Sequence, residues 1–312
     1  MKILLATPLY PPEIGGPATY TKELAERLRN DHSITILAYT TKSPEQINSV
    51  ELVFVDKFKP LYYRLWRFFL AALKYSKHAD LIYVQNALAA GLPAVLAGLL
   101  RRKPVVIKFV GDEAWERAYQ TGKTKKLLVD FLQHPEGGTK IWLFSKIQGW
   151  VLRHASLVTT PSKYLGEEIG KAYSLKQNAC VTNYNAAEHE SHPFAPQKRK
   201  HQLLTTARLV SWKGIDGIIE AVALLASKIP DLKLVVAGDG PEMENLKRQT
   251  ANLKINDAIE FVGQVPRSQT RYLRDESEIY ILNSLYEGLP HTVLSSFAAK
   301  IPVIATDIPG TD

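Results

Sequence analysis

Short apolar runs alternate with amphipathic segments along most of this chain, and this alternation constrains its fold more than any other feature. The runs are rich in Val, Ile and Leu without strict polar alternation, which is typical of parallel strands buried on both faces. Between two such runs, Tyr20, Leu24 and Leu28 share one helical face at a spacing of four residues. The pattern predicts an α/β fold built on a doubly wound parallel sheet.

The pattern occurs twice. The first set of strands is expected at 2–7, 33–38, 51–55, 80–85, 104–110 and 156–160. A polar segment with two prolines, 188–200, is then typical of a linker. The second set of strands is expected at 203–207, 233–237, 259–262, 279–282 and 302–305, with helices at 215–227, 241–252, 266–274 and 290–299. We therefore predict two Rossmann-like lobes, 1–190 and 191–312, which face a cleft and bind ligands beyond the carboxyl ends of their strands.

Composition narrows the class of protein. The 312 residues suffice for two domains, and the net charge of +8 suits an anionic partner. No zinc-ligand spacing or RNA-binding signature occurs, so nucleic acid is not an expected partner. The single cysteine, Cys180, and the lack of an apolar stretch of ~20 residues favour a cytoplasmic protein. The chain ends soon after the last expected strand, which predicts a truncated second lobe.

One segment has a composition that suits a membrane surface. Residues 61–75 mix aromatic side chains with Lys and Arg. Such a helix can lie on an anionic lipid surface as a peripheral anchor. A core helix with a basic outer face is the alternative, and the sequence leaves both open.

A glycine pair, Gly15-Gly16, follows the first expected strand and precedes a helix. Glycines let the backbone approach a ligand, and a helix N-terminus offers N–H groups to an anion. An ordinary tight turn is the alternative. The loop lacks the three spaced glycines of the dinucleotide fingerprint, which disfavours a nicotinamide-dependent oxidoreductase.

Two cations follow the first strand of the second lobe. Arg208 stands at the carboxyl end of that strand, and Lys213 follows five residues later before a helix. A guanidinium fork and an ammonium charge together suit a diphosphate group. The alternative is a pair of surface cations without a ligand.

Two further turns follow strands of the second lobe. The turn Ala-Gly-Asp-Gly-Pro-Glu at 237–242 either lines a ligand or only connects two elements. At 283–292 the chain reads Asn-Ser-Leu-Tyr-Glu-Gly-Leu-Pro-His-Thr. Glu287 can accept hydrogen bonds from sugar hydroxyls, and the amides near His291 and Thr292 can face a phosphate. The alternative is that Glu287 only balances the charge of the helix N-terminus.

In their order and spacing, these motifs and Phe-Val-Gly-Gln-Val at 261–265 resemble the retaining glycosyltransferases of family 4, the glycosyl transferases group 1. The likeness extends over nearly the whole chain. It implies the two-lobed GT-B fold and the transfer of a hexose, or its N-acetyl derivative, from a nucleotide-diphosphate sugar. The acceptor implied is a glycan or a lipid-linked precursor, as in polysaccharide biosynthesis. The resemblance also implies retention of anomeric configuration and no protein-bound metal or cofactor.

The resemblance implies roles for particular residues. Arg208 and Lys213 hold the donor diphosphate, and Glu287 binds hydroxyls of the donor sugar. The Gly15-Gly16 backbone approaches the donor phosphates across the cleft. The remaining donor-binding positions implied are Gly238, Gly263, Val265, Gly288, Leu289, Pro290, His291, Thr292 and Ser295.

One donor-binding position departs from the family pattern. The family usually has a second glutamate eight positions after the first, where it accepts hydrogen bonds from the nucleotide ribose, and this chain has Ser295 there. Serine is shorter and neutral, so donor binding should weaken by roughly 1.5–3 kcal/mol. The alternative function is therefore a non-catalytic nucleotide- or glycan-binding GT-B subunit with a degenerate donor site.

A second departure concerns the first lobe. Many relatives carry a histidine after the strand that corresponds to 105–110, whereas this chain continues with Gly111, Asp112 and Glu113. We expect Asp112 to be catalytic, because Asp112 and Glu113 are the carboxylates best placed to meet an acceptor hydroxyl or to replace that histidine. The alternative is a turn followed by a charged helix start.

Overall fold

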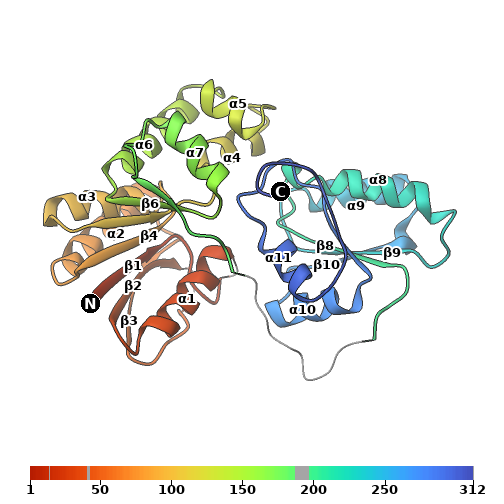
Figure 1. Cartoon of the computed structure of the whole chain (residues 1–312), viewed down its shortest axis with the longest axis horizontal. Helices are drawn as coiled ribbons and strands as arrows, with labels where there is room; N and C mark the ends of the chain where they lie inside the picture. The colour runs from red at the N-terminus through yellow and green to blue at the C-terminus, as the bar shows by residue number, and fades with distance from the viewer. Residues whose placement is uncertain (14, 41–42, 187–196, 312) are drawn as a thin grey trace. The chain divides into compact units, whose positions relative to one another are not determined.

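The structure is a computed structural model that describes residues 1–13, 15–40, 43–186 and 197–311. The chain divides into two compact units, Met1–Asn183 and Tyr184–Asp312 (Figure 1). The predicted boundary between residues 190 and 191 lies outside the described residues, as does most of the predicted linker. Each unit has its own sheet and its own helices.

The first unit is built on a seven-stranded parallel sheet with the order β3-β2-β1-β4-β5-β6-β7. Its strands are β1 (Lys2–Thr7), β2 (Ser33–Thr40), β3 (Val50–Asp56), β4 (Leu81–Gln85), β5 (Val105–Lys108), β6 (Leu157–Thr160) and β7 (Cys180–Thr182). Starting from β1, the strands β2 and β3 extend the sheet on one side, and β4 to β7 extend it on the other. The topological switch point therefore lies between β1 and β4.

Helices cover both faces of this sheet (Figure 1). They are α1 (Gly16–Leu28), α2 (Leu61–Ser76), α3 (Gly91–Arg101), α4 (Glu113–Gln120), α5 (Leu128–Gln133), α6 (Thr139–His154) and α7 (Lys163–Ala172). Ala25 of α1 belongs to one core cluster with Ile36 and Ala38 of β2. The next residue, Tyr39, stacks on Phe68 of α2 at 4.5 Å between ring centroids. Since successive strand residues point to opposite faces, α1 and α2 lie on opposite faces of the sheet.

The second unit repeats the plan with five parallel strands in the order β10-β9-β8-β11-β12. Its strands are β8 (Gln202–Thr206), β9 (Lys233–Ala237), β10 (Ile259–Gly263), β11 (Ile279–Leu282) and β12 (Val303–Ala305). Its helices are α8 (Ile215–Ala226), α9 (Met243–Asn252), α10 (Arg267–Glu276) and α11 (His291–Ala298), with short 3-10 turns η1 (Ser211–Lys213) and η2 (Asn256–Ala258). The switch point of this sheet lies between β8 and β11.

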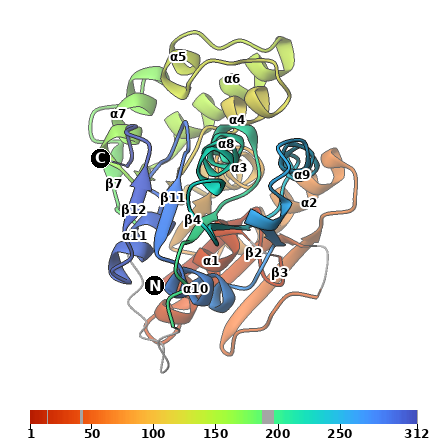
Figure 2. The same ribbon diagram turned by 90° about the vertical axis from the view of Figure 1, so that its right-hand side faces the viewer.

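Two apolar cores enclose the second sheet. Val236 packs in a cluster with Ile219 of α8, and the neighbouring residue Val235 packs in another cluster with Val293 of α11. Figure 2 shows α8 and α9 side by side on the first of these faces. Helices on both faces of two parallel sheets confirm the predicted α/β, doubly wound fold class.

The predicted strands are present, with ends that differ by at most two residues. The sequence prediction missed β7, which pairs with β6 at the edge of the first sheet. The strand has only three residues and follows a polar turn that contains Gln177 and Asn178. A three-residue edge strand buries too little to produce an apolar run in the sequence.

Candidate active site

The loops that follow β8 and β11 meet beyond the carboxyl ends of these neighbouring strands. The Leu285 amide donates to the Trp212 carbonyl at 2.8 Å, and Asn283 Nδ2 donates to the Gly214 carbonyl at 2.9 Å. Gly214 has φ of 59°, and a Cβ atom there would lie 2.2 Å from the Asn283 carbonyl oxygen. Only glycine allows this approach, which occurs at the switch point where open α/β sheets bind ligands.

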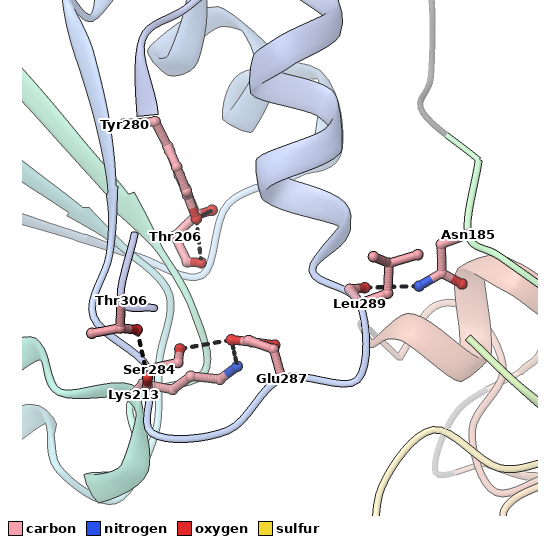
Figure 3. A network of polar contacts seen from close by, with 8 residues as sticks. All are labelled: Asn185, Thr206, Lys213, Tyr280, Ser284, Glu287, Leu289 and Thr306. Carbon is pink, nitrogen blue, oxygen red and sulfur yellow. Dashed lines mark hydrogen bonds and ion pairs between the residues drawn. The ribbon is translucent and has the colours of Figure 1, made fainter. Parts of the chain in front are cut away.

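An ion pair joins the two loops. Lys213 Nζ lies 2.5 Å from Glu287 Oε1, and Ser284 Oγ donates to the same oxygen at 2.6 Å (Figure 3). The side chains are 19% exposed for Lys213 and 11% exposed for Glu287, so water screens the pair only partly. Both contacts use Oε1, and Oε2 has no hydrogen-bond partner among the described residues. That oxygen can accept a hydrogen bond from a ligand hydroxyl.

Residues near the end of the chain hold the Glu287 loop in place. Thr306 Oγ1 donates to the Ser284 carbonyl at 2.6 Å (Figure 3). Gly310 has φ of 99°, and a Cβ atom there would lie 2.3 Å from the Glu287 carbonyl oxygen. None of these three residues was predicted from the sequence to have a role. Ser284 lay within the 283–292 motif, whereas Thr306 and Gly310 had no signal beyond a Pro-Gly turn.

Arg208 stands directly after β8 with an exposed side chain. Within the described part of the chain, its guanidinium makes no hydrogen bond and no ion pair. Its backbone, in contrast, is held firmly, because the Leu209 amide donates to the Asp239 carbonyl at 3.0 Å. Gly238 has φ of 141°, and a Cβ atom there would lie 1.8 Å from the Ala207 carbonyl oxygen. The turn after β9 therefore holds the backbone next to Arg208, while the Arg208 guanidinium remains available to a ligand.

The turns after β9 and β10 are also joined. The Gly238 amide donates to the Gly263 carbonyl at 2.8 Å. Gly263 has φ of 67°, and no heavy atom lies within 4 Å of a Cβ atom built on it. Val265 follows two residues later and is half-buried. Gly263 and Val265, two of the predicted donor-binding residues, thus belong to the next loop along the same edge of the sheet.

The segment before α11 contains the remaining predicted donor-binding residues. Gly288 and Pro290 are buried, and the Leu289 carbonyl accepts a hydrogen bond from Asn185 Nδ2 at 2.9 Å (Figure 3). Pro290 occupies the N-cap position of α11, and its side chain cannot accept a hydrogen bond from the helix. His291, the first residue of the helix, is exposed.

Within α11, Thr292 and Ser295 differ in their contacts. The Tyr280 hydroxyl lies 3.0 Å from Thr206 Oγ1 and also bonds the Thr292 side chain (Figure 3 shows the Thr206 contact). Burial raises the pKa of Tyr280, so the phenol stays protonated and ties β8, β11 and α11 together. Ser295 is half-buried, and its hydroxyl has no hydrogen-bond partner among the described residues.

In the first unit, Gly15 and Gly16 lead into α1, where the Thr19 amide donates to the Gly15 carbonyl at 3.1 Å. Because the loop follows β1, it lies beside the switch point of the first sheet. This placement agrees with the position that the sequence analysis expected for the pair.

Asp112, the predicted catalytic carboxylate of the first unit, is fully buried as the N-cap of α4. Its Oδ1 accepts a hydrogen bond from the Trp115 amide at 2.8 Å, and its Oδ2 accepts from Gln148 Nε2 at 2.5 Å and from the Tyr173 hydroxyl. Burial raises the pKa of Asp112, and these donors oppose the shift. The position matches the alternative of a turn and helix start, and it gives the predicted catalytic role no support.

Glu113 also has internal partners. Its Oε1 accepts hydrogen bonds from the Ala87 and Leu88 amides at 3.2 and 3.0 Å. Burial raises the pKa of Glu113 as well. The carboxylate therefore fixes the loop after β4, at the switch point of the first sheet.

The described residues contain neither a cluster of metal ligands nor a helix that could span a membrane. In the ranges that the structure covers, no three His, Cys, Asp or Glu side chains gather as a metal site. No helix within those ranges combines the length and apolar character that a membrane span requires.

Two parallel sheets, each surrounded by helices, define the GT-B class of fold. The structure of HepE from Anabaena in complex with UDP and glucose superimposes with a TM-score of 0.73 at 16% identity, over 99% of this chain and 81% of that one. WaaG, a glycosyltransferase involved in lipopolysaccharide biosynthesis, superimposes with a TM-score of 0.72 at 14% identity, over 99% and 82%. These likenesses show the fold.

Sequence profiles identify the family. The glycosyl transferase 4-like domain matches residues 15–186, and glycosyl transferases group 1 matches residues 187–312. The chain therefore belongs to the glycosyltransferase family that combines these two domains, the group 1 or family 4 type. The alpha-monoglucosyldiacylglycerol synthase of Streptococcus pneumoniae is 26% identical over 98% of this chain and 71% of its own length. An uncharacterized glycosyltransferase of Methanocaldococcus jannaschii is 24% identical over 99% of this chain and 81% of its own length.

Proposed function

We propose that the protein is a retaining glycosyltransferase that moves a hexosyl unit from a nucleotide-diphosphate sugar to a glycan or lipid-linked acceptor. The observation that carries this proposal is the arrangement at the second switch point. An exposed, unpaired Arg208 begins the loop that ends in the Lys213–Glu287 ion pair. Cations and a carboxylate with one free oxygen are the groups needed to hold a diphosphate and a sugar.

In the proposed reaction, the bond between the anomeric carbon and the diphosphate oxygen breaks, and the diphosphate leaves with the electron pair. The acceptor hydroxyl oxygen bonds the anomeric carbon on the same face, and its proton passes to the departing diphosphate oxygen. Arg208 and Lys213 offset the charge that develops on the leaving diphosphate. A donor phosphate takes over Lys213 from Glu287, whose carboxylate then accepts hydrogen bonds from the sugar hydroxyls.

We propose that this chemistry needs no metal or other cofactor. Fixed cations and the N-terminus of α11 supply positive potential where the leaving group departs. The described residues of the second unit provide Arg208 and Lys213 for this purpose. The test is transfer activity in the presence of a chelator, and its loss would contradict the proposal.

The ligands and products of similar proteins support the choice of donor and acceptor. HepE was crystallised with UDP and glucose, and with UDP-glucose. The pneumococcal relative is a synthase of a glucosylated diacylglycerol. We therefore propose a UDP-sugar as the first donor to test and a lipid-linked acceptor. We also propose that the protein works peripherally at the cytoplasmic face of a membrane.

The position of Ser295 favours a second candidate, a non-catalytic nucleotide- or glycan-binding subunit. Its hydroxyl, on the helix that follows Glu287, has no partner among the described residues. A short neutral side chain there removes one charged anchor for a ribose. This candidate predicts a folded protein that turns over no donor.

The decisive experiment is calorimetric titration of the chain with UDP, GDP and ADP beside a thermal melt. We expect saturable binding of one diphosphate, lost in Arg208→Ala and kept in Lys247→Ala, which removes an exposed cation from α9 of the same unit. A cooperative melt without binding of any diphosphate would overturn the donor site. Binding of a diphosphate without turnover of its sugar conjugates would favour the non-catalytic subunit.

A further inference from the structure

Helix α2 carries apolar side chains on two opposite faces. Phe68 and Ala72, four residues apart, are buried in the first unit. Tyr62, Trp66 and Leu70, at the same spacing, are exposed to 77%, 58% and 38%. The solvent side of a surface helix normally carries polar residues. The outer side of α2 therefore has the composition of a contact surface.

Helix α3 extends this surface. Helices α2 and α3 lie side by side (Figure 1), and Arg101 Nε at the end of α3 donates to the Leu73 carbonyl of α2 at 3.1 Å. Three leucines of α3 are exposed to between 37% and 66%. We define the outer face as six of the exposed apolar side chains of the two helices. The outer face comprises Tyr62, Trp66, Leu70, Leu96, Leu99 and Leu100.

Most of the charged side chains around the outer face are positive. Between Lys57 and Gly111 the only acidic residue is Asp80, and its Oδ2 accepts a hydrogen bond from the Lys2 amide at 2.7 Å. Several cations of this stretch form no ion pair with any residue that the structure describes. These cations are Lys59, Arg67, Lys74, Lys77, Arg101, Arg102 and Lys103. A basic field of this kind attracts an anionic surface.

A hollow of about 630 Å³ adjoins the outer face at the amino ends of β1 and β2. Its lining combines Leu70 and Leu73 with Lys74, Lys77 and Arg101, and its acidic side chain, Glu51, accepts a hydrogen bond from Thr35 Oγ1 at 3.3 Å. These cations can hold a phosphate, beside leucines that can contact an apolar chain. The hollow lies at the opposite end of the strands from the Gly15-Gly16 loop. Its occupation therefore leaves the carboxyl edge of the first sheet open.

We propose that the outer face binds the surface of an anionic phospholipid bilayer and that the hollow holds the phosphate of one lipid headgroup. Trp and Tyr side chains favour the interface between headgroups and acyl chains, and the surrounding cations match an anionic leaflet. This inference rests on the proposed peripheral membrane contact and does not depend on the transfer reaction. It assigns a phosphate-bearing lipid to a hollow that the donor site does not use.

The test is cosedimentation of the full chain with vesicles of phosphatidylcholine alone or mixed with phosphatidylglycerol. We expect binding to the mixed vesicles and weak binding to the neutral ones. Tyr62→Ser with Trp66→Ser should abolish binding, because these exposed side chains provide the apolar contact. Lys74→Gln with Lys77→Gln should weaken binding by about 25-fold, or about fivefold for each cation removed.

Lys163→Gln with Lys171→Gln is the matched control for the hollow. Both lysines are exposed on α7, which contacts β6 and β7 at one edge of the first sheet. Helix α2 contacts β2 and β3 at the opposite edge. This pair removes the same charge and should weaken binding far less. Equal losses in the two pairs would overturn the headgroup site while leaving the membrane contact intact. No binding to either kind of vesicle would overturn both, whatever the transferase assay shows.

Two further outcomes would reassign the surface. In the first outcome, the chain binds inorganic phosphate saturably, and Lys74→Gln with Lys77→Gln abolishes this binding without changing vesicle binding. The hollow would then hold a soluble phosphate and not a lipid headgroup. A dimer that Tyr62→Ser with Trp66→Ser converts to a monomer, together with no vesicle binding, would make the outer face an interface between copies. Thermal melts of each variant should match the unmodified chain, because all of the substituted side chains are exposed or half-buried.

Discussion

The two units carry charged side chains after their parallel strands, but the contacts of these side chains differ. In the second unit, Arg208 is exposed and unpaired among the described residues, and Glu287 keeps one carboxylate oxygen free. In the first unit, Asp112 is fully buried, and both of its oxygens accept internal hydrogen bonds. Position after a strand is therefore not enough to assign a function. Free hydrogen-bonding capacity at the surface separates a candidate ligand-binding group from a structural one.

The largest expected difference between the units is in activity. Arg208→Ala removes a cation that, in the proposed reaction, offsets the charge on the leaving group, so kcat/KM should fall by roughly 10²–10³-fold. Asp112→Asn keeps a side chain that can cap α4, so kcat/KM should stay close to the unmodified value. The measurement is steady-state transfer with the preferred donor.

The interpretation of both variants requires a folded protein, which a thermal melt of each variant can establish. Unchanged turnover in Arg208→Ala would remove this residue from the donor site. A loss in Asp112→Asn as large as that in Arg208→Ala, with an unchanged melt, would restore Asp112 as a catalytic residue. The comparison between the two units would then fail.

The next effect concerns the support of the Arg208 loop. Gly238→Ala places a Cβ atom 1.8 Å from the Ala207 carbonyl oxygen at φ of 141°, so we expect a loss of roughly 3 kcal/mol or more in the free energy of unfolding. Gly263→Ala meets no atom within 4 Å, although its φ of 67° is unfavourable, and should cost about 1 kcal/mol. Urea unfolding of both variants measures the difference, and equal losses would show that the close approach after β9 is not rigid.

A third effect tests the structural role of Asp112. Asp112→Ala removes the cap of α4 and leaves Gln148 and Tyr173 without their buried acceptor, at a cost of about 3 kcal/mol. Asp112→Asn retains an acceptor for the Trp115 amide but turns an NH2 group toward the Gln148 and Tyr173 donors, so it should cost about 2 kcal/mol. Chemical unfolding of the two variants checks this order. A smaller loss for Asp112→Ala than for Asp112→Asn would mean that a buried NH2 group facing the Gln148 and Tyr173 donors costs more than the lost cap.

The sequence predicted the fold well because inner strands such as β1 and β9 are buried on both faces and appear as continuous apolar runs. It could not predict β7, whose three residues lie at a sheet edge. Arg208, Lys213 and Glu287 were identifiable because each follows an expected strand. Their pairing was not, because Lys213 and Glu287 are 74 positions apart and meet only through the order of β8 and β11.

The contrast between Asp112 and Glu287 shows the same limit. The sequence presents both as carboxylates in a turn before a helix. Whether an oxygen remains free depends on partners from distant segments, namely Gln148 and Tyr173 for Asp112 and Lys213 for Glu287. A local pattern contains no information on such partners.

The smallest effect concerns Ser295, where the second unit itself lacks a charge that the family usually has. Ser295→Glu places a carboxylate on α11, eight positions after Glu287, where it can accept hydrogen bonds from a ribose. A charge-assisted hydrogen bond contributes about 1.5 kcal/mol at the lower end of its range, so the nucleotide diphosphate should bind about tenfold more tightly. Calorimetric titration measures the change.

Ser295→Gln is the matched control, because it has the length of glutamate without its charge, and it should tighten binding less. If both variants tighten binding equally, length and not charge limits the present site. If neither does, the ribose lies away from α11, and the Lys213–Glu287 loop must hold the donor mainly through its diphosphate and sugar. If Ser295→Glu tightens binding and also raises turnover, the donor site is active and only its contact with the ribose is weak. The second unit would then differ from the first, where the carboxylates of Asp112 and Glu113 accept internal hydrogen bonds.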